Sequence, residues 1–201
     1  LAIGKIYSSK DVQEISKLIS DAEKKQNLEN GSIKLILWME TAQAIINAYE
    51  ILTSNKRIVG SAFGAEDFTN DMGIPRTENE QEILFARNQL SIASKAANVI
   101  ALDTPFFAFK NPESLRNNSL FARSIGFKGK FAIHPAQIDI INECFSPSQK
   151  EIDHAIKVIE IFEEAKKQGR GSTSLDGLVI DVPVVKRAES LLKISKDMGK
   201  I

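Results

Sequence analysis

Five short apolar runs recur along this 201-residue chain, and helical or loop-forming segments separate them. The runs are continuous in apolar residues rather than strictly alternating, as in parallel strands that are covered on both faces. Strands that alternate with helices indicate an α/β fold built on a parallel sheet. The runs are LAIGKI (1–6), IKLILWM (33–39), RIVGSAFG (57–64), VIALD (99–103) and GKFAI (129–133).

Two architectures fit this order of elements, a (β/α) barrel and an open doubly wound sheet. No G-x-G-x-x-G follows the first run, which argues against a dinucleotide-binding fold. Both architectures place their active sites at the carboxyl ends of the strands. The candidates for chemistry are therefore the polar residues that follow the runs, namely Glu40, Glu66, Asp67, Asp103 and His134.

Local signals predict where several helices lie. Residues 41–52 have helical periodicity. Thr77 and Glu80 have the spacing of a capping box, which predicts a helix that continues to about Ala97. The acidic stretch FGAEDFTNDMG (63–73) lies between these two helices and is predicted to be a loop.

The C-terminal part of the chain is predicted to be a separate element. Ser148 and Glu151 have the spacing of a cap for a long amphipathic helix. The stretch GRGSTSLDG (169–177) is typical of a flexible connector. We therefore expect a main domain at 1–170 and a C-terminal extension at 171–201.

Composition excludes several classes of function. Lys plus Arg equals Asp plus Glu at 26 each, so the chain lacks the basic excess of a nucleic-acid or membrane-surface binder. The single cysteine, Cys144, excludes a disulfide framework within the chain and a cysteine-based zinc site. It also favours a reducing compartment such as the cytoplasm. No apolar run approaches the ~18 residues of a membrane span.

Glu40 and Asp67 form the most informative pair. Each carboxylate taken alone is explained by the first turn of a helix, where the helix dipole favours an acid. Together they follow consecutive strands, which lie about 4.8 Å apart in a sheet, so that one ion could bridge both. Two carboxylates with open positions suit Mg²⁺, which keeps several waters and takes substrate oxygens as further ligands.

The residues around Asp67 suggest how a small carboxylate would bind. Gly64 and Ala65 allow backbone N–H groups to approach a ligand closely. Asp71 precedes Gly73 and is predicted to shape a turn. Arg76 is expected to pair with a carboxylate of the acidic stretch in a structural role.

The sequence allows two interpretations of the role of each of three further polar residues. Asp103 is either a loop cap or a site residue, and His134 is either structural or part of a site. Asp181 lies within the apolar stretch LVIDVPVV, where a charge is costly unless it is paired or exposed to a site. It either caps a turn or helix before Pro183 or completes an active site, including that of a neighbouring subunit.

Six motifs in fixed order resemble the family of citrate lyase β-subunits, malyl-CoA and methylmalyl-CoA lyases and β-like malyl-CoA thioesterases, within the wider HpcH/HpaI aldolase group. The resemblance covers nearly the whole chain, and the string of motifs is far more specific than any one of them. The motifs are WMETAQAIINAYEI, FGAEDFTNDMGIPRT, ALDTPF, GFKGKFAIHPAQI, FSPS and LDGLVIDVPVVKRAE.

The resemblance implies a TIM (β/α)8 barrel that assembles as a homotrimer, with a C-terminal extension that acts as a lid. The run at 1–6 resembles the family's fourth strand, and the run at 129–133 resembles its eighth. The family's first three strands carry an acidic motif and a substrate-binding arginine, which have no counterpart here. We therefore expect an N-terminally truncated barrel of about strands 4–8, since a full barrel takes about 250 residues.

The resemblance also assigns roles to residues. Glu40 and Asp67 would bind Mg²⁺, and the backbone of Ala65, Glu66 and Asp67 would hold the carboxylate of the oxo acid. Asp181 would act in catalysis from an adjacent subunit. The residues expected near the CoA or carrier-protein arm are Asp103, Pro105, His134 and Pro135.

The implied activity is that of a Mg²⁺-dependent carbon–carbon lyase. It would cleave a 3-hydroxy-carboxyacyl thioester, such as citryl-CoA or malyl-CoA, into a 2-oxo acid and an acyl thioester. One alternative is a malyl-CoA thioesterase or malate-synthase-like activity, and another is a non-catalytic CoA-ester-binding remnant. The expected partner is a CoA or acyl-carrier thioester rather than nucleic acid or membrane, and the expected location is cytoplasmic, or mitochondrial in a eukaryote.

Overall fold

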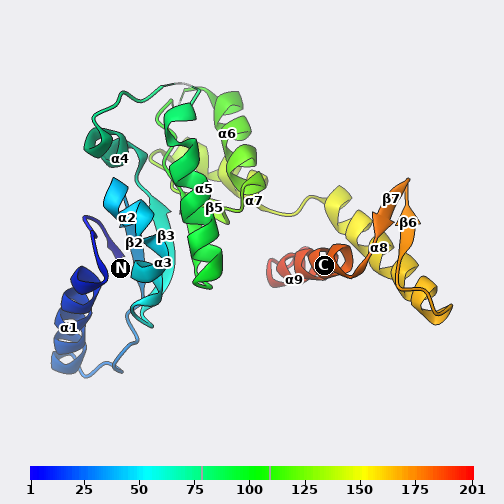
Figure 1. Ribbon diagram of the computed structural model, residues 1–201, viewed down its shortest axis with the longest axis horizontal. Coiled ribbons are helices and arrows are strands. Elements are labelled where there is room, and N and C mark those ends of the chain that lie inside the picture. Colours follow the sequence, from blue (N-terminus) through cyan, green and yellow to red (C-terminus); the bar gives the residue numbers. More distant parts are fainter. Residues whose placement is uncertain (78, 109) are drawn as a thin grey trace. The chain divides into compact units, whose positions relative to one another are not determined.

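The computed structural model describes residues 1–77, 79–108 and 110–201. The chain forms two compact units, Leu1–Ile141 and Asn142–Ile201 (Figure 1). The boundary therefore falls earlier in the chain than the predicted one at 170. The reason is that the long helix before residue 170 packs with the C-terminal segments and shares their apolar core.

The first unit is built on a sheet of five parallel strands, ordered along the sheet as they are along the chain. Each strand lies inside one of the predicted apolar runs, so the predicted α/β fold with a parallel sheet is confirmed. The strands are β1 (Ala2–Ile3), β2 (Leu35–Met39), β3 (Ile58–Phe63), β4 (Ile100–Asp103) and β5 (Gly129–Lys130).

Helices connect successive strands of the first unit or follow its last strand, and in β2 one face is buried more deeply than the other. In β2, Leu35, Leu37 and Met39 are fully buried, whereas the alternate residues Ile36 and Trp38 are half-buried. The helices are α1 (Ser9–Lys25), α2 (Ala42–Ile46), α3 (Ala48–Thr53), α4 (Ala65–Met72), α5 (Gln81–Ala96), α6 (Pro112–Ser124), the 3-10 helix η1 (Pro135–Gln137) and α7 (Ile138–Phe145).

Two of the predicted local structures differ from the observed ones. The acidic stretch at 63–73 is not a loop, because its central residues form helix α4. Gly64 is the N-cap of this helix, and Gly73 ends it with a left-handed backbone at φ 68°. The predicted helix at 41–52 is divided into α2 and α3 at Asn47.

The predicted capping box at Thr77 and Glu80 is wrong. Helix α5 begins at Gln81, and Glu80 precedes it with a left-handed backbone at φ 54°. The Glu80 carboxylate is used elsewhere, because it pairs with the guanidinium groups of Arg76 and Arg87. An acid engaged by two arginines does not reach back to cap the helix.

The second unit packs two helices with a β-hairpin. The cap predicted at Ser148 and Glu151 is confirmed. The predicted flexible connector instead contains the first strand and the turn of a hairpin, whose turn residues Asp176 and Gly177 both have positive φ, as type I′ hairpin turns require. The elements are α8 (Gln149–Lys167), β6 (Thr173–Leu175), β7 (Leu178–Ile180) and α9 (Val182–Asp197). Their shared core consists of Ala155, Val158, Phe162, Ile180, Val185 and Ala188.

A buried ion pair fastens α1 to the amino end of the sheet. Two guanidinium nitrogens of Arg57 donate to the two carboxylate oxygens of Glu23 at 2.7 and 2.6 Å. The same carboxylate accepts hydrogen bonds from the backbone N–H groups of Gly31 and Ile33. The hydrogen bonds from Arg57, followed by those from the backbone, hold the pKa of Glu23 well below its usual value.

This pair predicts a pH-dependent stability. Glu23→Gln removes the negative charge that compensates the buried guanidinium of Arg57, so we expect a lower urea midpoint at neutral pH. Because the folded-state pKa of Glu23 is depressed, its stabilisation is present above the unfolded value of about 4.5 and is lost as the pH falls below it. The difference in urea midpoint between wild type and variant should therefore shrink from pH 7 to pH 3, as measured by urea unfolding followed by circular dichroism. Glu29→Gln, at an exposed site, is the matched control, and a difference that stays constant with pH would contradict the assignment.

No helix among the described residues combines the length and the apolar character needed to cross a membrane.

Candidate active site

The Glu40 carboxylate follows β2 and is held in a narrow space. Its side chain is 8% exposed, and the backbone N–H of Lys5 donates to its Oε1 at 2.7 Å. A Cβ added to Gly64 would lie 2.8 Å from Glu40 Oε2, and one added to Gly4 would lie 3.0 Å from Oε1. Gly64 in particular leaves no room for a side chain, so the two glycines and the Lys5 amide fix the position of the carboxylate.

Asp67 lies in the first turn of α4, directly after β3. Its side chain is half exposed, whereas the neighbouring Ala65 is buried. The backbone N–H of Ala65 donates to Thr104 Oγ1 at 3.3 Å, which ties the helix to the segment after β4. The first N–H groups of a helix lack partners within that helix and attract anions. Binding of a carboxylate by the backbone of Ala65, Glu66 and Asp67 stays a prediction that this geometry permits.

Lys5 lies between the two predicted metal ligands. Its Nζ is 2.6 Å from Asp67 Oδ1 and 3.7 Å from Glu40 Oε1. The hydrogen bond to Asp67 is the main cause that raises the pKa of Lys5. The structure thus brings Glu40 and Asp67 together around the ammonium of Lys5, and metal binding by the pair stays a prediction. Reasoning from the sequence missed Lys5, although a charged residue within the first apolar run was a visible signal.

The site chemistry is that of a paired carboxylate with open positions. Among the described residues no group of three or more His, Cys, Asp or Glu side chains could hold a metal ion. Mg²⁺ is usually bound by only one or two protein carboxylates and takes its other ligands from water and substrate. A site with two carboxylates therefore suits Mg²⁺ better than a metal whose ligands must all come from the protein. The positive charge of Lys5 at this position shows that the pair accommodates a cation.

An open cavity of about 390 Å³ surrounds the pair. Its lining includes Trp38, Glu40, Asp67, Thr104 and Pro105. The Trp38 ring packs against Phe131, with ring centroids 4.5 Å apart, and forms an apolar wall beside the carboxylates. The cavity therefore combines two carboxylates with an apolar surface, and ligand sites commonly pair a few polar groups with apolar walls in this way.

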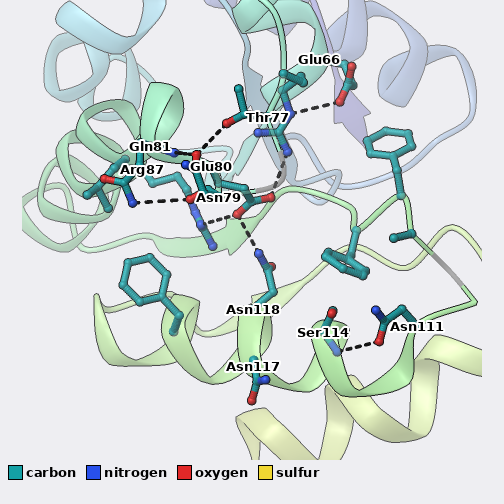
Figure 2. Close-up of a pocket in the computed structure, with 16 residues that line it drawn as sticks. Glu66, Thr77, Asn79, Glu80, Gln81, Arg87, Asn111, Ser114, Asn117 and Asn118 are labelled. Atoms are coloured by element: carbon teal, nitrogen blue, oxygen red, sulfur yellow. Dashed lines mark hydrogen bonds and ion pairs between the residues drawn. The ribbon is translucent and has the colours of Figure 1, made fainter.

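A second cavity of about 670 Å³ shares Glu66 and Phe107 with the first (Figure 2). Arg76 joins its wall to α4, because its guanidinium pairs with Glu66 at 3.1 Å, Glu80 at 2.9 Å and Glu82 at 2.8 Å. The predicted pairing of Arg76 with the acidic stretch is thereby confirmed. The carboxylate of Glu66 is therefore paired with Arg76.

Asp71 links α4 to α2. It was predicted to shape a turn, but it lies in the last turn of α4, and its Oδ2 accepts a hydrogen bond from the backbone N–H of Ala42 at 2.8 Å. Ala42 begins α2, only two residues after Glu40. This contact between helices joins the segments that carry the two predicted metal ligands.

Asp103 is fully buried and faces two cations. Arg87 donates to its carboxylate from Nε at 3.0 Å and from Nη2 at 2.8 Å, and the ammonium of Lys130 donates to the same group. Burial lowers the pKa of Lys130, and the Asp103 carboxylate opposes that effect. Asp103 was predicted to lie near a CoA arm, but its side chain lines neither cavity, because these internal ion pairs hold it. Lys130, a charge inside an apolar run, was the signal that sequence reasoning missed.

The segments after β4 and β5 lie together. His134 is the N-cap of η1, and the buried Gln137 donates from Nε2 to the carbonyl oxygen of Phe106 at 2.7 Å. The two loops predicted to approach CoA are therefore joined by a hydrogen bond. Contact of CoA with Pro105, His134 and Pro135 stays a prediction.

Asp181 belongs to the second unit and is the N-cap of α9. Its Oδ1 accepts a hydrogen bond from the backbone N–H of Val184 at 3.2 Å. This is the capping role before Pro183 that the sequence left open as an alternative. A cap leaves the second carboxylate oxygen available, so the predicted catalytic role stays a prediction.

Comparison with known proteins identifies similar sequences. Residues 1–135 match the family model described as HpcH/HpaI aldolase/citrate lyase. The chain is 36% identical over 195 residues to citrate lyase subunit beta of Leuconostoc mesenteroides subsp. cremoris, and this alignment covers 97% of this chain and 65% of that protein. It is 30% identical over 203 residues to the mitochondrial citramalyl-CoA lyase of Homo sapiens, covering 97% and 59% respectively. The chain thus spans about two thirds or less of the length of these relatives.

Solved structures share the fold. A citrate lyase from Burkholderia xenovorans LB400 superposes with a TM-score of 0.87 at 22% identity, over 98% of this chain and 63% of that one. Mycobacterium tuberculosis CitE, solved with magnesium, acetoacetate and coenzyme A, has a TM-score of 0.78 at 23% identity, over 97% and 68%. At these identities the likeness concerns the fold.

Proposed function

The chain belongs to the HpcH/HpaI aldolase/citrate lyase family, and from this premise we propose that the protein is a Mg²⁺-dependent carbon–carbon lyase. Its substrate is a 3-hydroxy-carboxyacyl thioester, such as citryl-CoA or malyl-CoA, and its products are a 2-oxo acid and an acyl thioester. One observation carries the proposal, namely that the carboxylates of Glu40 and Asp67 lie together around the ammonium of Lys5 in an open cavity. The names of the relatives, citrate lyase subunit beta and citramalyl-CoA lyase, support it.

Glu40 and Asp67 are the residues that would hold the metal. When bound, Mg²⁺ supplies Lewis-acid polarisation of the substrate's oxygen atoms. The buried Glu40 gives a fixed anchor, and the half-exposed Asp67 gives a ligand that adjusts to the substrate. Glu66 contributes its backbone rather than its carboxylate, because Arg76 holds that carboxylate.

The residues of the first turn of α4 bind the substrate's carboxylate in this proposal. Their N–H groups and the helix dipole attract an anion at the end of the helix that lies beside Asp67. Thr104 braces this turn through Ala65. The apolar wall at Trp38 shields the reacting carbon atoms from water.

Asp181 is proposed as the base, delivered from the C-terminal unit of a neighbouring subunit. Its carboxylate takes the proton of the substrate hydroxyl, and the C–O bond becomes the carbonyl of the oxo acid. The bond from that carbon to the α-carbon of the thioester breaks, and its electron pair forms the thioester enolate. A proton taken up at the α-carbon then gives the acyl thioester. The arm of the thioester runs along the loops that contain Pro105, His134 and Pro135.

We also propose that the sheet is part of a (β/α)8 barrel. The unbroken parallel order of the strands supports this, because a doubly wound sheet reverses its strand order. The deeper burial of one face of β2 supports it as well, since helices cover only the outside of a barrel.

Product analysis tests the proposed activity. The purified protein is incubated with citryl-CoA, citramalyl-CoA or malyl-CoA, with Mg²⁺ or with EDTA, and oxo acid, acyl-CoA and free CoA are measured. The proposal expects oxo acid and acyl-CoA in equal amounts, only with Mg²⁺. Release of free CoA without oxo acid would show that the protein is a thioesterase and not a lyase. Substrate binding without turnover would show that it is a binding module.

A further inference from the structure

Lys5 has two unusual features that the proposed reaction does not use. Its backbone has φ 56°, in the left-handed region that residues with a side chain rarely adopt. Its ammonium lies within 4 Å of both proposed metal ligands. Strained backbone of this kind persists where the surrounding structure holds it, and it concentrates at functional sites.

The left-handed backbone gives Lys5 two contacts at once. The amide N–H points to Glu40 Oε1 at 2.7 Å, and the side chain reaches Asp67 Oδ1 at 2.6 Å. One residue thereby joins carboxylates that follow two neighbouring strands. Among the residues that the structure describes, Lys5 is the only cationic side chain paired with either carboxylate.

The charge balance explains why a cation is needed at this position. A nearly buried carboxylate such as Glu40 is costly unless a positive group compensates it. The Lys5 side chain is 62% exposed, so it remains free to swing into solvent. Exposed lysine–carboxylate pairs are weak, so a divalent ion displaces the ammonium at little cost.

We propose that Lys5 is a built-in counter-ion, which holds Glu40 and Asp67 together before the metal binds and leaves that position when Mg²⁺ enters. The inference rests on the proposed metal site. It adds that the Lys5 ammonium competes with Mg²⁺ for the two carboxylates. The backbone N–H of Lys5 stays on Glu40 throughout, while the ammonium and the metal ion exclude each other. Lys5 thus keeps the site ordered and lowers its affinity for divalent ions.

Mg²⁺ titrations of Lys5→Met and Lys5→Gln test this. Each variant removes the charge and keeps the amide N–H, so we expect the dissociation constant for Mg²⁺ to fall by about two- to tenfold. Binding is followed by calorimetry and by the fluorescence of Trp38, the single tryptophan, which lines the same cavity as the two carboxylates. Circular dichroism verifies that each variant keeps its fold.

Two matched variants give the controls. Lys10→Met removes another exposed lysine, which lies on α1, and should leave Mg²⁺ binding unchanged. Lys5→Arg keeps the charge and should bind Mg²⁺ no tighter than wild type. Unchanged or weaker binding by Lys5→Met and Lys5→Gln overturns the proposal, as does equal tightening by Lys10→Met.

The outcomes separate this inference from the proposed function. Mg²⁺ binding that depends on Glu40 but not on Lys5 leaves the metal site in place and removes only the counter-ion role. Absence of Mg²⁺ binding in wild type and in every variant overturns both.

Discussion

Glu40→Gln is expected to weaken Mg²⁺ binding by at least about 100-fold, because even residues that only support a metal ligand contribute up to about that factor. The amide oxygen of the new side chain still accepts the hydrogen bond from the Lys5 N–H, and the side chain has nearly the same shape, so the fold is retained. Asp67→Asn should have a similar effect, since it removes the second charged oxygen ligand. Lyase turnover should fall with metal occupancy in both variants. Calorimetric titration with MgCl₂ measures the loss directly.

Glu29→Gln is the control for this prediction. It makes the same chemical change at an exposed position, before β2 and therefore away from the carboxyl end of the sheet. Its affinity for Mg²⁺ should equal that of wild type. If Glu40→Gln also binds Mg²⁺ like wild type, the metal lies elsewhere and the proposed site is wrong.

Asp103→Ala should lower the free energy of unfolding by about 3–5 kcal/mol, the usual cost of removing one partner of a buried ion pair. The substitution leaves Lys130 and Arg87, both nearly inaccessible to solvent, without their shared carboxylate. Urea unfolding measures the change. Asp139→Asn, at an exposed site on α7, is the control and should change stability little.

A double variant distinguishes lost charge balance from lost packing. In Asp103→Ala with Lys130→Met, the remaining Arg87 still pairs with Glu80 at 2.9 Å. The double variant should therefore be less destabilised than the sum of the two single variants. Strict additivity would show that the three groups do not act as one network.

Much of the fold was predictable from local pattern. Each apolar run became a strand of the parallel sheet, and the cap at Ser148 and Glu151 formed. Such signals succeed because strand and cap preferences depend on neighbouring residues. The predicted loop at 63–73 failed for a related reason. Glycines at both ends of a polar stretch are typical of a loop, but they are also typical of a short helix that starts and stops abruptly.

The unit boundary was less predictable. Glycines at 169–177 suggested a break in the chain, but Asp176 and Gly177 supply the positive φ angles of a hairpin turn instead. The apolar face of α8 then packs on α9, and that packing decides which segments form a unit.

The sequence by itself determined the order of strands and helices, and it placed Glu40 and Asp67 at neighbouring strand ends, because a parallel sheet gathers the carboxyl ends of its strands at one edge. Only the tertiary structure decided which groups meet there. It placed the ammonium of Lys5 against an acid 62 residues away, and it buried Asp103 between Arg87 and Lys130. Contacts over such separations depend on backbone conformation and packing of the whole unit, which no local pattern of residues encodes.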